Sequence, residues 1–493
     1  MKEMKSDIVV IAAGPSGLAA AIAAAENGMS VIALEKAMNP GGAANMGMGP
    51  LGLETSVQKE ELNTITVDSA FEMFMNYTHW RVDANLVKKY FEKSGDTISW
   101  LQDMGVEFFK AAKYFPGSNP TWHIVKPETG SPGPRAAGTM IKRMVERAAD
   151  LGVRLLLQTQ GDSLVREDGR ITGVMAKTSE GENIHITCNA AIIATGGFGD
   201  DIKMIREKTG YEYGKDYFGF RIPGLKGDGI RMAREAGAAS TDISIEMAVS
   251  QPGENVTTAM HAAFNQPNLL VNLKGERFFN EGLFENSTFA GNAVNIQPQR
   301  CGVMIFDEAI KEYYEKYGVD VVSYVLNQVN IDGFDHDFDY ALQQGNPFIF
   351  KADTLDLLAE QAGIEKKQFL KTVELYNYYC SSSDVQFGKR KQYLKPVRTG
   401  PFYAAKFFPG AYGTLGGIKI NHYTEVVTPS DEPIPGLYAA GTDTCTIYGD
   451  SYMFLLPGNT MGYAINTGRM AGENAADYVG KYCRQSSKKT GVN

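Results

Sequence analysis

The sequence contains few residues of the kinds that mark metal or disulfide chemistry. It has five cysteines and six histidines among 493 residues, and the cysteines are scattered without the CxxC spacing that zinc or iron–sulfur ligation uses. A CxxCH segment for covalent haem attachment is also absent. This pattern predicts no metal site and free thiols in a reducing compartment, which indicates a cytoplasmic protein.

Concentrated positive charge is lacking as well. The formal net charge is -9 and the sequence pI is about 5.4, without the basic stripe that a nucleic-acid surface needs. The apolar run from Ile8 to Ala25 contains Gly14, Pro15 and Gly17 and no cleavage pattern, so it predicts a buried strand and helix instead of a signal peptide. We therefore expect no nucleic-acid partner and no membrane span.

The periodicity of apolar residues predicts a βαβ unit at the start of the chain. Ile8–Ala12 is typical of a buried parallel strand, Gly17–Asn27 of an alanine-rich helix, and Ser30–Leu34 of a second strand that ends at Glu35. Further along, Val153–Gln158 and Ala190–Ala194 predict strands. The patterns also predict amphipathic helices over Asn85–Met104, Gly138–Ala149 and Lys366–Cys380, and a long closing helix over Asn459–Tyr478.

The turn after the first predicted strand matches a dinucleotide-binding fingerprint with one departure. The fingerprint places glycines at the tight turn, at the pyrophosphate and at the helix–strand contact, with an acidic residue about 20 residues further on for the ribose. Here Ala12 replaces the first glycine, and Glu35 is the acidic residue. Phosphate would lie at the helix N-terminus, where free N–H groups favour an anion. The predicted contacts are Ala13, Gly14, Pro15, Ser16, Gly17, Glu35 and Lys36.

Later segments identify the dinucleotide. They include Gly41-Gly42-Ala43-Ala44-Asn45, Ala194-Thr195-Gly196-Gly197, Gly227-Asp228-Gly229, the stretch from Asn272 to Glu281, Gly413-Thr414-Leu415-Gly416-Gly417, Gly436 to Asp443, and Thr467 to Glu473. On these segments nearly the whole chain resembles the flavoprotein subunits of fumarate reductase and succinate dehydrogenase, together with their relatives the ketosteroid dehydrogenases. The resemblance implies that the cofactor is FAD.

The same resemblance implies an α/β fold: a Rossmann-like FAD-binding domain with an inserted α+β capping domain. We expect a discontinuous FAD-binding domain over residues 1–247 and 412–493 and the capping domain over residues 248–411. Relatives with covalent flavin have a histidine in the loop where this chain has Ala43, Ala44 and Asn45, so noncovalent FAD is expected. The resemblance also places the N-terminus of the predicted closing helix, near Gly458 and Asn459, at the N1–O2 edge of the flavin. It adds these cofactor contacts: Gly41, Gly42, Ala43, Ala44, Thr195, Gly196, Gly197, Asp228, Gly441, Asp443, Gly458 and Asn459.

The cationic residues that hold and protonate fumarate in those relatives are missing. Glu285 stands where the resemblance places a proton-donating arginine, and Tyr412 and Gly413 stand where it places a histidine pair. The segment from Tyr448 to Phe454 contains no arginine for a carboxylate. An ionised glutamate cannot replace the cation, and a dicarboxylate needs charge-assisted anchors. These differences exclude fumarate as the expected substrate.

Aromatic side chains occupy the segments that the resemblance places around the flavin. They are Trp122, Tyr412, Tyr448, Tyr452 and Phe454. Such a lining suits a bulky, weakly charged enone or ring ketone, with a tyrosine hydroxyl as proton donor. The predicted catalytic residues are Tyr412, Tyr452 and Tyr448, with His123 as a proton donor if its pKa stays near neutral.

The sequence thus predicts an FAD-dependent oxidoreductase that acts on a CH–CH bond by hydride transfer between flavin N5 and the carbon beta to a carbonyl. One alternative is a ketosteroid or bile-acid-type dehydrogenase or double-bond reductase. An alternative of another class is a flavin electron-transfer subunit. Because the chain has no haem motif and no flavodoxin-like segment, electrons are expected from an external donor, either NAD(P)H or a redox protein.

Overall fold

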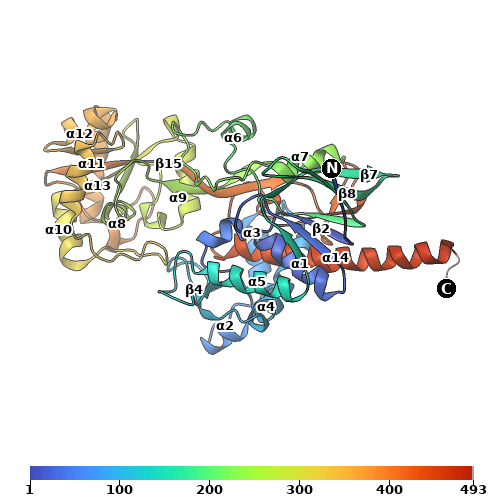
Figure 1. Ribbon diagram of the computed structural model, residues 1–493. Helices are drawn as coiled ribbons and strands as arrows, with labels where there is room; N and C mark the ends of the chain where they lie inside the picture. The colour runs from blue at the N-terminus through green and yellow to red at the C-terminus, as the bar shows by residue number, and fades with distance from the viewer. Residues whose placement is uncertain (491–493) are drawn as a thin grey trace. The chain divides into compact units, whose positions relative to one another are not determined.

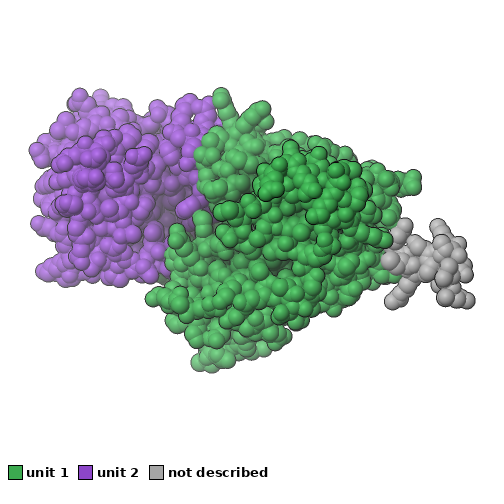
Figure 2. Space-filling model, in the orientation of Figure 1, with its two compact units in different colours: residues 1–209, 221–245, 413–493 green, residues 210–220, 246–412 purple. Residues whose placement is uncertain are grey.

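The computed structural model describes residues 1–490, with side chains up to Lys481, and the chain forms two compact units (Figure 2). Unit 1 comprises residues 1–209, 221–245 and the chain from 413 onward; unit 2 comprises residues 210–220 and 246–412. The domain boundaries predicted from the sequence assigned residues 210–220 to the FAD-binding domain. They belong to unit 2 because the N–H groups of Phe218 and Phe220 donate to Pro409 O and Ala411 O at 2.9 and 2.8 Å.

A six-stranded sheet forms the centre of unit 1 (Figure 1). Strand β2 (Ile8–Ile11) pairs in parallel with β3 (Val31–Leu34) on one side and with β10 (Ala190–Ile193) on the other. Every residue of these three strands is buried, which explains their uninterrupted apolar runs. A parallel sheet flanked by helices confirms the predicted Rossmann-like α/β fold. The order is β16 (Glu425–Val427), β17 (Pro433–Ala439), β10, β2, β3 and β6 (Arg154–Leu156), of which only β16 is antiparallel to its neighbour.

The first and last long helices of the chain lie side by side in unit 1 (Figure 1). Helix α1 (Pro15–Glu26) packs on α14 (Asn459–Thr490), and glycines make the approach possible. A Cβ atom on Gly468 would lie 2.2 Å from Ser16 O, and one on Gly472 would lie 2.3 Å from Ala20 O. The backbone of α1 thus contacts the face of α14 directly.

The remaining elements of unit 1 surround this centre. A second sheet has the order β1 (Lys2–Lys5), β9 (Asn183–Thr187), β8 (Arg170–Thr178) and β7 (Thr159–Glu167). A hairpin pairs β4 (Phe108–Ala112) with β5 (Trp122–Val125). The other helices are α2 (Ser56–Glu60), α3 (Val67–Tyr77), α4 (Ala84–Asp103), α5 (Ala137–Asp150), α6 (Ile202–Thr209) and α7 (Asp228–Glu235).

Unit 2 has a core of its own, built on strand β15 (Phe402–Gly417), which continues into unit 1. Within unit 2, β15 pairs with β13 (Gly302–Asp307) and β14 (Ile349–Ala352), and β13 pairs with β12 (Leu269–Asn272). The hydrophobic core of this unit contains five buried aromatic rings: Phe264, Phe306, Phe334, Phe338 and Tyr403. The helices are α8 (Thr258–Phe264), α9 (Ser287–Asn295), α10 (Glu308–Tyr317), α11 (Phe334–Gln343), α12 (Leu355–Ala362) and α13 (Lys366–Ser381).

Two predicted elements differ from the structure in their bounds. The strand expected over Val153–Gln158 is shorter in the structure, where it corresponds to β6, and Gln158, with a φ of 52°, separates β6 from β7. The closing helix continues beyond Tyr478 to Thr490. Among the described residues, no helix has both the length and the apolar character that crossing a bilayer requires.

Candidate active site

The turn between β2 and α1 forms an open helix N-terminus. Gly14 caps the helix with Pro15 in its first turn, and a Cβ on Gly14 would meet no atom within 4 Å. At Gly17, by contrast, a Cβ would lie 1.9 Å from Ala12 O, so only glycine lets the helix pack here. Ala12 itself adopts a φ of 83°, the conformation that the missing glycine of the fingerprint would take without strain. The free space at Gly14 fits the diphosphate of a dinucleotide.

Glu35 lies at the end of β3 and holds the same turn. Its two carboxylate oxygens accept the N–H groups of Ala13 at 3.0 Å and Ala37 at 2.9 Å. Since each carboxylate oxygen has two lone pairs, both can also accept a ribose hydroxyl. Glu35 therefore fits the predicted ribose contact.

Lys36 and Asp228 form an ion pair with each other. The Lys36 Nζ to Asp228 Oδ2 distance is 2.6 Å, Lys36 also donates to Gly224 O, and Arg231 contacts the same carboxylate. The pair holds the start of α7 next to the end of β3. That either residue contacts FAD stays a prediction.

The loop after β3 returns to the first turn. Gly41, with a φ of 104°, donates its N–H to Ala13 O at 2.8 Å. A Cβ on Gly42 would lie 3.7 Å from Gly14 Cα. The 3₁₀ helix η1 (Gly42–Met46) contains Ala43 and Ala44 and no histidine. This loop therefore borders the space at Gly14, as a pyrophosphate-binding loop would, and has no histidine to form a covalent flavin bond.

Asp443 organises a second glycine turn from within the protein. Its fully buried carboxylate accepts the N–H groups of Thr195, Gly196 and Gly197 at 2.5, 3.1 and 2.9 Å, and also the Thr195 hydroxyl. Burial raises the pKa of Asp443, and these donors oppose that effect. With its lone pairs occupied in this way, Asp443 is suited to positioning residues 195–197 more than to contacting ribitol itself.

Gly441, Gly458 and Asn459 lie near the N-termini of α1 and α14. Gly441 donates its N–H to Thr467 Oγ1 at 3.0 Å, and a Cβ there would lie 2.7 Å from Ser16 Oγ. Gly458, with a φ of 81°, precedes α14, and Asn459 is its fully buried first residue. Together the two glycine turns, Glu35 and both helix starts fit an FAD molecule, which supplies hydride chemistry at N5 of its isoalloxazine ring.

An aromatic cluster lies next to the start of α14. Ring centroids are 4.9 Å apart for Tyr448 and Tyr452, 4.9 Å for Tyr452 and Phe454, 5.0 Å for Tyr114 and Phe454, and 5.8 Å for Tyr114 and Trp122. We call these five residues the aromatic cluster. Tyr114 is the member that the sequence did not single out; its only signal is an aromatic pair with Phe115 in the loop between β4 and β5.

Two contacts join the aromatic cluster to α14. The Thr460 hydroxyl, in the first turn of the helix, donates to the Tyr452 hydroxyl at 2.9 Å. A Cβ on Gly458 would lie 2.6 Å from Trp122 Cδ1, so the indole packs against the helix start. Tyr448 is 1% exposed, while Tyr452 is 6% exposed, which makes Tyr452 the better placed of the two to reach a ligand.

His123 is not a proton donor at neutral pH, and this corrects the sequence prediction. Its ring is fully buried, with Nε2 2.7 Å from Thr55 Oγ1 and Nδ1 3.0 Å from Thr121 O. Burial lowers the pKa of His123 to about 4, with the bond to Thr121 opposing that effect. The imidazole is therefore neutral and holds the β5 strand in place.

The fourth predicted catalytic residue, Tyr412, belongs to unit 2, whereas Tyr448 and Tyr452 belong to unit 1. Its side chain is 39% exposed and stacks on Phe220 with centroids 5.6 Å apart and planes at 12°. An exposed, pre-oriented phenol is available to a ligand that reaches this part of unit 2.

Two further polar side chains of unit 2 have the character of ligand contacts. Gln251 is 8% exposed, yet neither atom of its amide has a hydrogen-bond partner among the described residues. Glu285 is half-buried, and burial raises the pKa of its carboxyl while Arg390 opposes the effect. A bond of 3.0 Å from Val249 N–H to Ser287 Oγ joins the two segments, two residues away from each side chain.

A buried group of ion pairs holds the chain just before Glu285. Arg277 binds Glu281 at 2.7 Å and Asp384 at 2.9 Å, all buried, and so fixes the 3₁₀ turn η2 (Glu281–Leu283) that precedes Glu285. Gln251 escaped the sequence argument because only its lack of a partner singles it out.

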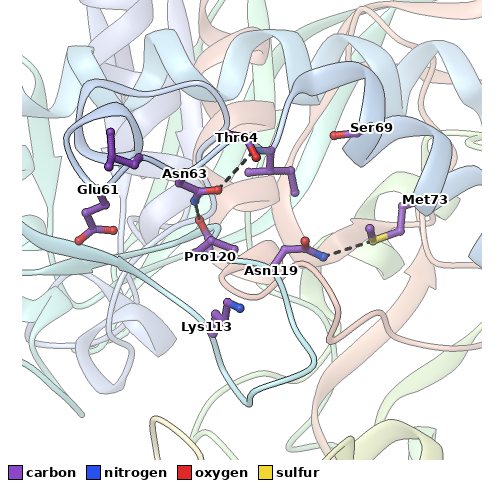
Figure 3. A pocket seen from close by; sticks show the side chains of 10 residues that line it. Glu61, Asn63, Thr64, Ser69, Met73, Lys113, Asn119 and Pro120 are labelled. Carbon is purple, nitrogen blue, oxygen red and sulfur yellow. Dashed lines mark hydrogen bonds between the residues drawn. The ribbon is translucent and has the colours of Figure 1, made fainter.

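An open pocket of about 570 Å³ lies on unit 1 (Figure 3). Asn63 donates to Pro120 O at 2.8 Å on one wall, and Asn119 donates to Met73 Sδ at 3.4 Å on another. Asn119 also binds Leu455 O, next to Phe454 of the aromatic cluster. None of the predicted site residues lines this pocket, so it is distinct from the candidate active site.

Fold and site together define a flavin-dependent oxidoreductase: a Rossmann-like unit shaped for FAD, with an uncharged aromatic cluster at the helix start expected to face the flavin. The chain belongs to the family described as FAD binding domain, whose model matches residues 7–460. Within that family it is an oxidoreductase acting on CH–CH bonds, and FAD is its cofactor.

Similar proteins cover nearly the whole chain. A vinyl phenol reductase from Lactiplantibacillus plantarum is 32% identical over 491 residues, covering 96% of this chain and 97% of that protein. A 3-ketosteroid-Δ4-(5α)-dehydrogenase from Rhodococcus jostii, solved with 4-androstene-3,17-dione, matches with a TM-score of 0.78 and 25% identity over 97% of this chain and 98% of that one. A flavocytochrome c3 fumarate reductase matches with a TM-score of 0.70 and 26% identity over 97% and 79% of the two chains. These matches confirm the predicted resemblance.

Proposed function

We propose that this protein reduces the C=C bond of an α,β-unsaturated carbonyl compound or a close analogue that is bulky and weakly charged, and not fumarate. The observation that carries the proposal is the aromatic cluster next to the start of α14, whose five side chains are all uncharged and offer no charged anchor to a dicarboxylate. Bound FAD would supply the hydride from N5.

The relatives support a substrate of this kind. One is a reductase of a vinyl phenol, whose double bond is conjugated to an aromatic ring, and another was solved with an enone steroid. Both ligands present a flat, largely apolar body to the protein, for which stacked aromatic side chains are suited.

Three side chains are candidates to deliver the proton that accompanies the hydride. The hydroxyl of Tyr452 accepts a hydrogen bond from Thr460, in the first turn of α14, and Tyr412 has an exposed phenol. Glu285 joins them, because burial raises the pKa of its carboxyl, the direction that favours the protonated form. Within unit 2, the Gln251 amide N–H is a candidate donor to a carbonyl oxygen, and within unit 1 the ring of Tyr448 packs against that of Tyr452.

The proposal is tested by reducing the holoenzyme anaerobically and mixing it with 4-vinylphenol, cinnamate, a 3-keto-4-ene steroid, cyclohexenone and fumarate. The rate of flavin reoxidation is followed by absorbance in a stopped-flow instrument. We expect an aromatic or ring substrate to react at least ~10-fold faster than fumarate, since a lost charged anchor costs on the order of 1.4 kcal/mol or more. Fumarate as the fastest oxidant would overturn the proposal.

Single substitutions assign the proton donor. The three variants are Tyr452→Phe, Tyr412→Phe and Glu285→Gln, each tested with the best substrate. The variant that lacks the true proton donor should retain FAD, and its flavin should be reoxidised about 10²-fold more slowly or worse. Tyr317→Phe, at a tyrosine that is 64% exposed on α10, is the matched control and should change nothing. Unchanged rates in all three variants would remove these residues from the mechanism.

The same experiment separates the alternatives. A ketosteroid dehydrogenase or double-bond reductase, favoured by the TM-score of 0.78, would prefer the steroid over every smaller compound. An electron-transfer subunit would be reoxidised by none of them, but rapidly by a one-electron partner protein.

We further propose an external electron donor, either NAD(P)H or a redox protein, and a cytoplasmic location. The four described cysteines, which are free thiols, support a reducing compartment. Anaerobic mixing of the oxidised protein with NADH or NADPH tests the donor: bleaching of the flavin identifies a nicotinamide, and its absence indicates a redox protein.

A further inference from the structure

The first residue of α14 carries a buried hydrogen-bond donor that the protein does not use. Asn459 is fully buried, and its Oδ1 accepts the hydroxyl of Tyr90 at 2.9 Å. Its Nδ2 has no hydrogen-bond partner among the described residues. A buried amide left without an acceptor costs roughly 1–3 kcal/mol, so a ligand that accepts from it would recover that free energy.

Tyr90, on α4, determines which way this amide faces. Its hydroxyl is completely buried and donates to Asn459 Oδ1, with Asn459 O 3.3 Å away. Burial raises the pKa of Tyr90 well above its ordinary value, so the hydroxyl stays protonated and stays a donor. Because Oδ1 is held by Tyr90, the NH₂ group of the amide must face the other way.

Packing keeps Tyr90 in this position. Its ring meets that of Tyr463 edge to face, with centroids 5.6 Å apart at 84°. A Cβ on Gly462 would lie 2.7 Å from the Tyr90 hydroxyl, so the first turn of α14 has room for the phenol only because that residue is glycine. The amide orientation is therefore set by the backbone of α14 and by α4.

The helix start adds positive potential at the same place. Gly458 O accepts the N–H of Gly462 at 2.9 Å, which is the first bond of the helix, and the N–H groups before it have no partner within the helix. A helix of this length carries a partial positive charge at its N-terminus. Together with the Asn459 amide it favours an acceptor that bears negative charge.

We infer that Tyr90 is a positioning residue that holds the Asn459 amide as a donor to the pyrimidine edge of bound FAD, and that the pair thereby binds reduced FAD more tightly than oxidised FAD. Two-electron reduction with one proton at N5 leaves a negative charge spread over N1 and the C2 carbonyl oxygen, whereas the oxidised ring is neutral. A donor fixed at that edge stabilises the reduced form preferentially. The inference rests on FAD binding alone and does not depend on the substrate.

The test compares the affinity for oxidised FAD with the two-electron midpoint potential, both measured without substrate. Replacing the amide by Asn459→Ala should weaken binding of reduced FAD about tenfold more than that of oxidised FAD, which lowers the potential by about 30 mV. Tyr90→Phe keeps the ring and frees the amide to rotate, so it should lower the potential in the same direction by a smaller amount, about threefold in affinity ratio.

Two further variants make the result decisive. Asn459→Asp suits a helix N-terminus and can accept from Tyr90, but its carboxylate repels reduced flavin, so the affinity ratio should fall by more than tenfold. Tyr463→Phe removes a neighbouring hydroxyl, equally buried, that bonds Thr444 and not Asn459; its potential should equal that of the parent protein. An unchanged potential in Tyr90→Phe and Asn459→Asp overturns the inference. So does an equal loss of affinity for both redox states in Tyr90→Phe, or an equal shift in Tyr463→Phe.

Discussion

The backbone conformation of Ala12 reflects the one position at which this chain differs from the dinucleotide fingerprint. Ala12 has a φ of 83° where the fingerprint has glycine, and its carbonyl oxygen lies against Gly17. The left-handed region costs an L-residue about 1–2 kcal/mol. The strain is retained because the buried strand β2 and the helix α1 on either side fix the turn.

Ala12→Gly should raise the free energy of unfolding of the FAD-free protein by about 0.5–1 kcal/mol, since the relief of strain exceeds the added entropy of the unfolded chain. Urea unfolding measures the change. Ala13→Gly is the matched control: Ala13 is not among the residues with positive φ, so glycine there should lower stability by a similar amount. Destabilisation of equal size at both positions would contradict the strain argument.

His123 predicts a pH dependence of stability. Its pKa in the folded protein is about 4, below the value near 6.5 of an unfolded chain, so unfolding takes up a proton between these values. The contribution of neutral His123 to the free energy of unfolding is therefore fully present above pH 6.5. It decreases by about 3 kcal/mol as the pH falls to 4. His123→Gln should therefore remove part of the acid sensitivity when urea unfolding is compared at pH 7.5, 6 and 5. Parallel pH profiles for the two proteins would refute the assignment.

At the scale of single residues, the sequence predicts which side chains lie together better than it predicts the burial and contacts of each one. Of the five aromatic residues expected around the flavin, Trp122, Tyr448, Tyr452 and Phe454 belong to the aromatic cluster, whereas Tyr412 lies in unit 2 and stacks on Phe220. His123 does not meet the condition of a near-neutral pKa because its burial depends on distant residues: the Thr55 hydroxyl donates to its Nε2, and a Cβ on Gly52 would lie 2.8 Å from its Cε1. Nothing in the residues beside His123 encodes those contacts.

Among the elements, the contact of α1 with α14 depends on glycine. Gly468→Ala would place a methyl group 2.2 Å from Ser16 O and force the helices apart, at a cost of about 1–3 kcal/mol. FAD affinity should fall as well, because Ser16 lies in the turn that is expected to hold the pyrophosphate. Thermal unfolding and fluorescence titration with FAD measure the two effects.

The same helix supplies the control. Gly480 lies in α14 with nothing within 4 Å of its Cβ position, so Gly480→Ala should stabilise the protein by about 0.5–1 kcal/mol through helix propensity alone. If Gly468→Ala behaved like Gly480→Ala, the helices would not be in backbone contact at that point.

The elements themselves follow from the sequence where periodicity is strong. The βαβ unit, α4, α5 and α13 agree with the predicted ranges to within two residues at each end. The break at Gln158 has no glycine or proline to announce it, and the pairing of residues 218–220 with 409–411 joins segments almost 200 residues apart. Such long-range pairing leaves no local pattern, which is why residues 210–220 were not predicted to belong with unit 2.

At the scale of the whole molecule, each unit has its own core, and the predicted FAD contacts all belong to unit 1. Calorimetry should therefore resolve two unfolding transitions, of which only one shifts upward with FAD. Free FAD at 100 times its dissociation constant should stabilise that unit by about 2.7 kcal/mol. A single transition that moves as a whole would show that the units unfold together.

The order of strands in the central sheet has a consequence for how the protein is made on the ribosome. Strand β10 needs β17 as a neighbour, and α1 needs α14, so the centre of unit 1 lacks a strand and a covering helix until residues 433–439 and 459–490 have been synthesised. Unit 2, by contrast, is complete in sequence once Tyr412 has emerged. Because domains fold as their residues become available, the inserted unit should reach its native state first. The nascent N-terminal segment, with the apolar β2 and β3 still only partly covered, should meanwhile be the part of the chain that chaperones bind.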